Sequence, residues 1–251
     1  MKKAPLRISA VSYINARPFV YGIKHSGFLK NYSLSLDIPS VCAEKLLKGN
    51  ADIGLAPVAI IPELEKYFVF PGFCIGADGP VTSVMLYSDV PLKEIKRVWL
   101  DNQSRTSVLL VKILAGHFWK ISPVWMEAQN GYEKKIKGTD AGVIIGDRNF
   151  LKRPKSRFAF DLSAEWKSFT GSPFVFACWI SLRPLNKKDS AAFKKALKFG
   201  IDRRHESVKK LPRGFNPGII RKYLDDSIRY ELGGAQKNAM KLFLKLGRMI
   251  E

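Results

Sequence analysis

The amino-acid sequence predicts an α/β fold divided into two lobes. Short strand and helix patterns alternate through residues 1–85 and again through residues 96–180, and the chain is predicted to be helical from about Asp189. Such alternation is typical of parallel sheets with helices packed on their faces. A single doubly wound sheet is the alternative that this pattern leaves open.

The first unit has clear boundary residues. Ser40 is a plausible N-cap for a helix that ends at Gly49. The strand at 52–56 follows this helix and is stopped by Pro57. The predicted elements are strands at 6–11, 34–38 and 52–56 and helices at 17–29 and 40–49.

The second unit repeats this rhythm, and the chain is expected to pass twice between the lobes. Its predicted elements are strands at 96–100, 123–126 and 141–145 and a helix at 104–119. Extended stretches followed by proline suit the two crossings, near residues 87–91 and 177–183. We therefore expect one discontinuous lobe, 1–87 plus 181–251, and a second lobe, 88–180. The ligand is expected between them, at the carboxyl ends of strands.

Composition indicates a globular protein of the cytoplasm. Apolar residues make up 46% and charged residues 25% of the chain. Apolar runs such as residues 174–180 are too short to cross a bilayer, so no membrane insertion is expected, and no signal peptide is recognised at the N-terminus. Three scattered cysteines suggest buried, reduced thiols, and no metal motif is present.

The charge is unusual, because 42 Lys and Arg against 22 Asp and Glu give a net charge of +20. Such an excess is compatible with nucleic acid, a membrane surface or an anionic substrate. Apolar residues recur at helical spacing in the densest basic region, 187–222, which is typical of a solvated helix face. Nucleic-acid motifs are lacking, so steering of an anionic ligand is favoured over nucleic-acid binding. The sequence does not give the oligomeric state.

A first polar segment lies at the turn from the first strand into the first helix. Ser12, Asn15 and Arg17 are candidate binding residues there, and Pro18 suits the first helical turn. Asn15 would otherwise serve only as a helix cap.

A second polar segment, residues 101–107, follows the strand at 96–100 and opens a helix. Free N–H groups at a helix N-terminus favour a carboxylate, so Ser104, Arg105, Thr106 and Ser107 are candidate anion-binding residues. Capping alone is the alternative.

Further candidates enter the two expected crossings and end a third strand. Ser83 offers a neutral hydroxyl, and Gly171 allows backbone to approach a ligand closely. Asp147 would add a carboxylate to the cleft, although a structural ion pair with Arg148 is an alternative. No phosphate-binding glycine loop is present, and the three histidines lie outside these segments, which argues against a Ser–His–Asp hydrolase.

Taken together, the segments resemble the chorismate dehydratase family of the futalosine route to menaquinone. The resemblance spans nearly the whole chain and differs mainly around residues 234–236 and in the high charge. Its pieces are ISAVSYINARPF, ADIGLAPVAIIP, SVMLYSDVPLKEIKRVWLDNQSRTSVLL, AGVIIGDRNF, FDLSAEWKSFTGSPFVFACW and YLDDSIRYELGG. The resemblance implies a fold like that of type II periplasmic binding proteins.

The resemblance also implies cofactor-free dehydration of chorismate, a dicarboxylate, to 3-[(1-carboxyvinyl)oxy]benzoate. Asn15 would hold the reacting end of the substrate, and Asp147 is the leading protein carboxylate near the site. The substrate carboxylates would be held by Ser83, Ser104, Arg105 and Thr106. Either Asp147 or the enolpyruvyl carboxylate of the substrate is the base. A non-catalytic solute-binding protein for a small aromatic or dicarboxylic acid is the alternative function.

Overall fold

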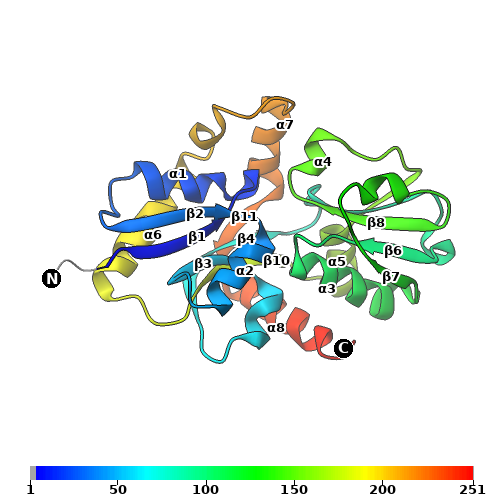
Figure 1. The fold of residues 1–251 in the computed structure, drawn as a ribbon, viewed down its shortest axis with the longest axis horizontal. Coiled ribbons are helices and arrows are strands. Elements are labelled where there is room, and N and C mark those ends of the chain that lie inside the picture. The colour runs from blue at the N-terminus through cyan, green and yellow to red at the C-terminus, as the bar shows by residue number, and fades with distance from the viewer. Residues whose placement is uncertain (1–3, 251) are drawn as a thin grey trace.

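The computed structural model describes residues 4–250 and contains two β-sheets, each covered by helices (Figure 1). A six-stranded sheet has the order β11-β4-β10-β3-β1-β2, and a five-stranded sheet has the order β7-β6-β8-β5-β9. The strands of the larger sheet are β1 (Leu6–Val11), β2 (Tyr32–Asp37), β3 (Ile53–Pro57), β4 (Phe68–Ala77), β10 (Phe174–Ser181) and β11 (Arg229–Leu232). Those of the smaller sheet are β5 (Val84–Ser88), β6 (Arg97–Leu100), β7 (Val124–Glu127), β8 (Asp140–Ile145) and β9 (Phe158–Asp161).

Helices connect the strands within each sheet and follow the last crossing. The α-helices are α1 (Arg17–His25), α2 (Pro39–Leu47), α3 (Arg105–Ile113), α4 (Arg148–Leu151), α5 (Leu162–Thr170), α6 (Lys187–Asp202), α7 (Pro217–Lys222) and α8 (Gly234–Gly247). Shorter 3-10 segments are η1 (Ile14–Ala16), η2 (Val58–Glu63), η3 (Leu92–Glu94), η5 (Tyr132–Lys135) and η6 (Glu206–Val208), and π-helical turns are η4 (Leu114–Trp119) and η7 (Tyr223–Ser227).

The parallel βαβ units expected from the sequence are confirmed. β1 pairs in parallel with β2 and β3, and β6 pairs in parallel with β7 and β8. The predicted cap at Ser40 is wrong, because α2 begins with Pro39 and Ile38 occupies the N-cap position. The C-terminal part is also not wholly helical, since β11 pairs antiparallel with β4.

The chain crosses between the sheets at residues 78–83 and 171–173, because β4 and β10 belong to the larger sheet and β5 belongs to the smaller one. Asp161 fixes the first crossing by accepting hydrogen bonds from the N–H groups of Val81 (2.8 Å) and Thr82 (2.6 Å). These pairings favour lobe limits several residues earlier than the expected 1–87 plus 181–251 and 88–180, since β5 and β10 each pair within one sheet.

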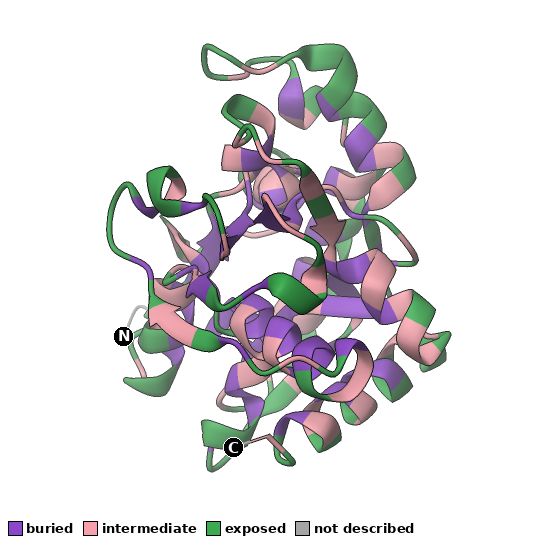
Figure 2. Cartoon of the chain, turned by 90° about the vertical axis from the view of Figure 1, so that its right-hand side faces the viewer, coloured by how far each residue is buried: buried purple, intermediate pink, exposed green. Residues whose placement is uncertain are grey.

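Large aromatic side chains fill the core of the larger lobe. Trp179 of β10 contacts Phe19 of α1 and Phe193 of α6 edge to face, with ring centroids 5.7 and 4.9 Å apart. Helices α1 and α6 cross in close contact at Gly22 and Gly200, where a Cβ atom would lie within 2 Å of the facing carbonyl oxygen. Buried residues concentrate on the strands and the inner faces of the helices (Figure 2).

Candidate functional site

A pocket lies where the two sheets face each other, with about 480 Å³ of empty space that is partly open to solvent. It forms at the carboxyl ends of β1, β3 and β8 and at the start of α2 and α3, which is where open α/β sheets usually bind ligands. Its lining residues are Val11, Tyr13, Asn15, Pro39, Pro57, Ile75, Ser83, Val84, Ser104, Ser107, Ile145, Gly146, Phe176 and Ala177.

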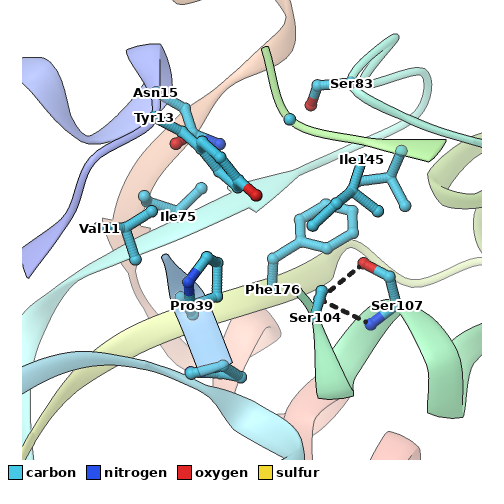
Figure 3. Close-up of a pocket in the computed structure, with 14 residues that line it drawn as sticks. Val11, Tyr13, Asn15, Pro39, Ile75, Ser83, Ser104, Ser107, Ile145 and Phe176 are labelled. Atoms are coloured by element: carbon cyan, nitrogen blue, oxygen red, sulfur yellow. Dashed lines mark hydrogen bonds between the residues drawn. The ribbon is translucent and has the colours of Figure 1, made fainter. Parts of the chain in front are cut away.

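The pocket has two polar ends separated by an apolar middle (Figure 3). Asn15 and Ser83 lie toward one end, and Ser104 and Ser107 lie at the other. The side chains between them are apolar or aromatic, among them Val11, Ile75, Ile145 and Phe176. This arrangement suits a small ring that carries polar groups at opposite sides.

Asn15 presents an unsatisfied acceptor at the first end. Its Oδ1 atom is buried without a hydrogen-bond partner, whereas its backbone carbonyl accepts a hydrogen bond from the hydroxyl of Tyr230 (2.8 Å). Asn15 does not cap a helix, since neither η1 nor α1 has a side-chain cap. The capping alternative is therefore wrong. A buried acceptor of this kind is costly unless a ligand supplies a donor.

Ser104 and Ser107 combine a cap with a place in the pocket wall. The Ser104 hydroxyl accepts a hydrogen bond from the Ser107 N–H (3.1 Å) and donates one to the Ser107 hydroxyl (3.0 Å). Ser104 is thus the N-cap of this helix, which is the role that the capping alternative gave to this segment. Because the first N–H groups of a helix lack intrahelical acceptors, the start of α3 also presents donors and a favourable dipole for an anion.

Asp147 lies beside the pocket and joins the two lobes. Its Oδ1 atom accepts a hydrogen bond from the N–H of Ile14 (3.0 Å), next to Asn15. Burial raises the pKa of Asp147 to about 6, against the opposing effects of the Ile14 N–H and the nearby charge of Arg17. The alternative, an ion pair with Arg148, is wrong, since that guanidinium binds Asp101 and Glu133 instead.

The remaining candidate residues lie outside the pocket lining. Ser12 is exposed, and Arg17 donates to the carbonyl of Lys210 (2.8 Å). Gly171 is exposed and ends α5 in a left-handed conformation, with a φ of 69°.

Two candidates on α3 face η2 instead of the pocket. Arg105 forms an ion pair with Glu63 (2.6 Å) in a separate outer groove, while the Thr106 hydroxyl accepts a hydrogen bond from the N–H of Ala59 (3.2 Å). Helical geometry accounts for this split, because successive residues of α3 point about 100° apart.

Sequence reasoning missed the aromatic residues of the site. Tyr13 projects into the middle of the pocket (Figure 3), and its hydroxyl donates to the side-chain carbonyl of Gln103. A Cβ atom on Gly146 would lie 2.8 Å from the Tyr13 ring, so the absence of a side chain there lets the lobes meet. Tyr223, discussed below, was also missed. Tyr13 lies within the first polar segment, but nothing in its spacing marks its direction.

A buried ion pair supports the Gln103 side of the pocket. Asp101 accepts hydrogen bonds from the Gln103 N–H (2.9 Å) and the Tyr132 hydroxyl (3.0 Å), and it pairs with Arg148. Burial raises the pKa of Asp101, and the neighbouring guanidinium opposes this effect. Asp101 therefore orients the turn that precedes α3.

Among residues 4–250, no group of three or more His, Cys, Asp and Glu side chains is placed to hold a metal ion. No helix in the same part of the chain is long and apolar enough to span a membrane.

The two sheets, the double crossing and the pocket between them define a two-lobed α/β protein of the ligand-binding type. Solved structures of other proteins have a similar fold. Protein AF1704 from Archaeoglobus fulgidus matches with a TM-score of 0.75 at 14% identity, covering 97% of this chain and 96% of the other. The Candida albicans CA3427 gene product, described as having the generic periplasmic binding protein fold, matches with a TM-score of 0.63 at 11% identity, covering 98% and 91%.

The family is shown by sequence. A family model described as menaquinone biosynthesis matches residues 6–249, so the chain belongs to this family. It is 33% identical over 253 residues to a chorismate dehydratase from Campylobacter jejuni, covering 94% of each chain. It is 27% identical over 263 residues to a chorismate dehydratase from Thermus thermophilus, covering 95% of this chain and 94% of the relative.

Proposed function

We propose that this protein is a hydro-lyase that dehydrates chorismate to 3-[(1-carboxyvinyl)oxy]benzoate. The observation that carries the proposal is the pocket with two unlike polar ends, one of which holds the unpartnered Oδ1 atom of Asn15. Chorismate offers a carboxylate on one side of its ring and a hydroxyl with an enolpyruvyl ether on the other. The names of the two relatives support this substrate.

The ring carboxylate is assigned to the end at Ser104 and Ser107. There, the helix N-terminus and two hydroxyls stabilise negative charge. The C3 proton of chorismate is vinylogous to this carboxylate, so charge that develops on deprotonation is delocalised toward α3. Donors aimed at developing charge lower the barrier to reaction.

The C4 hydroxyl is assigned to Asn15. A free Oδ1 atom accepts a hydrogen bond from a hydroxyl but not from a carboxylate, which has no proton to donate. This geometry favours the hydroxyl over the enolpyruvyl carboxylate as the partner of that atom.

The base in this proposal is the enolpyruvyl carboxylate of the substrate. It is tethered beside C3 and gains from proximity. The C3 proton passes to it, the C4–O bond breaks, and the proton leaves with the departing hydroxide as water. Asp147 serves as a positioning residue, because its Oδ1 atom already binds the Ile14 N–H and the residue is not part of the pocket lining.

We place this reaction in the cytoplasm, with chorismate as the small-molecule partner and without a cofactor. Three buried free cysteines, Cys42, Cys74 and Cys178, are compatible with a reducing compartment. The net charge of +20 suits capture of a dianion.

The test is to mix catalytic amounts of purified protein with chorismate and follow ultraviolet absorbance. Many turnovers of diene to benzoate support the enzyme. Stoichiometric binding without a spectral change would instead establish a solute-binding protein and remove the proposed reaction.

A further inference from the structure

A buried tyrosine contacts Ser83 at the Asn15 end of the pocket. Tyr223 of η7 is only 4% exposed, and its hydroxyl donates a hydrogen bond to the Ser83 hydroxyl (2.8 Å). Its ring packs against Phe150 of α4, with centroids 4.7 Å apart. Tyr223 is absent from the pocket lining itself.

The hydrogen bonds of this group have a defined direction. Burial raises the pKa of Tyr223 far above its usual range, so the hydroxyl stays protonated. It donates a hydrogen bond to the Ser83 oxygen. The Ser83 oxygen thus accepts one hydrogen bond, and its own proton remains available to a ligand.

We propose that Tyr223 is a positioning residue that holds the Ser83 hydroxyl as a hydrogen-bond donor toward the ligand, beside the unpartnered Oδ1 atom of Asn15. This inference rests on the proposed function. In chorismate, the C4 hydroxyl donates to Asn15 and accepts from Ser83 at the same time. As the C4–O bond breaks, negative charge grows on that oxygen, and the bond from Ser83 strengthens while Ser83 keeps its proton.

The backbone carbonyls of Ser83 and Asn15 have hydrogen-bond partners other than Tyr223. The effect of Tyr223 is therefore on the orientation of the Ser83 side chain. The Ser83 carbonyl accepts hydrogen bonds from the Gly146 N–H (2.8 Å) and from the side chain of Asn149 (3.1 Å). The Asn15 carbonyl accepts one from Tyr230. Without Tyr223, the Ser83 hydroxyl would rotate freely among its staggered orientations.

The experiment is a double-mutant cycle on chorismate turnover with Tyr223→Phe, Ser83→Ala and the double variant. Tyr223→Phe is expected to lower kcat about tenfold with KM changed less than about threefold. In the Ser83→Ala background, Tyr223→Phe should lower kcat by less than about twofold, because Tyr223 acts through Ser83. Tyr87→Phe is the matched control, since Tyr87 is 3% exposed and its hydroxyl donates to Asn149 (2.9 Å).

The proposal is overturned if Tyr223→Phe lowers kcat equally in the wild-type and Ser83→Ala backgrounds. It is also overturned if Tyr223→Phe keeps the wild-type kcat. A loss of kcat in Tyr87→Phe as large as in Tyr223→Phe also overturns it, because the effect would then be that of any buried tyrosine. Wild-type protein without turnover defeats the proposed function instead. The orientation of Ser83 is then read from a crystal structure of the Tyr223→Phe variant, where an unchanged position of the Ser83 hydroxyl oxygen overturns the role of Tyr223.

Discussion

The two polar ends of the pocket differ in how their hydrogen bonds are satisfied. Ser104 and Ser107 bind each other and cap α3, so the Ser104 hydroxyl has hydrogen-bond partners without a ligand. Asn15 keeps a buried acceptor without a partner. Leaving such a group unsatisfied costs roughly 1–3 kcal/mol. Under the proposed function, one end holds an anion throughout the reaction, while the other receives a hydrogen-bond donor from the substrate.

The largest difference between the ends should appear on removal of the unpartnered acceptor. Asn15→Ala is expected to lower kcat by about ten- to a hundredfold with little change in KM, because its acceptor holds the C4 hydroxyl in the orientation in which the C4–O bond breaks. Steady-state kinetics with chorismate check this. A lower melting temperature with normal kcat would remove Asn15 from the reacting end.

Asp147 tests whether the protein carboxylate beside the Asn15 end takes part in proton transfer. Asp147→Asn keeps the shape of the side chain, so turnover is expected to fall by less than about a hundredfold. Loss of a general base would cost about 10²–10⁴-fold. A loss at the severe end of this range, with substrate binding intact, would make Asp147 the base.

The raised pKa of Asp147 gives the same variant a second, thermodynamic readout. A folded-state pKa of about 6 lies above the roughly 3.9 of an unfolded Asp, so the folded state binds the proton more tightly. The resulting stabilisation is complete below about pH 4 and is lost as the pH rises through 6. The melting temperature of the wild type should therefore fall relative to Asp147→Asn between pH 4 and 7. A constant difference would contradict the burial of this carboxyl.

At the other end, substitution should affect binding more than turnover. Ser104→Ala is expected to raise KM about three- to tenfold at nearly constant kcat, because a carboxylate is charged in both ground and transition states. Thr106→Ala is the comparison, since its hydroxyl binds the Ala59 N–H and not the pocket. It should lower stability by about 1 kcal/mol and leave KM unchanged. Equal KM values for the two variants would contradict an anion site at Ser104.

The smallest expected effect concerns the contact between the lobes. Gly146→Ala places a methyl group against the Tyr13 ring and should raise KM a few-fold by holding the lobes apart. Gly138→Ala is the matched control, because Gly138 has a similar positive φ, 59° against 65°, with no atom within 4 Å of the added methyl. Both should lose stability from backbone strain, by about 1 kcal/mol or more. A change in KM for both variants would show that strain alone is responsible.

Much of the fold was predictable, because the alternation of strand and helix patterns and the residues at the ends of elements are local signals in the sequence. The strand at 6–11 and the start of a helix at Ser104 match the structure, since both depend on neighbouring residues. β11 was missed because its four residues follow directly on a helical turn, and only pairing with β4 makes them a strand. The crossings were placed too late for a similar reason, as extended sequence does not reveal which sheet a strand will join.

The site was predictable in part. Asn15, Ser83, Ser104 and Ser107 line the pocket because they follow strands or begin helices at the expected edge of the sheets. Tyr223 was not predictable, since it reaches Ser83 across 140 residues of chain from a π-helical turn.

The most direct test of the difference between the two ends is a crystal structure of the Asn15→Ala variant soaked with chorismate, because slow turnover should preserve the substrate. The ring carboxylate is expected within hydrogen-bond distance of Ser104 and the start of α3, with the C4 hydroxyl beside Ser83 and the space vacated at Asn15. The reverse orientation, with the ring carboxylate at Ser83, would contradict the assignment of the two ends.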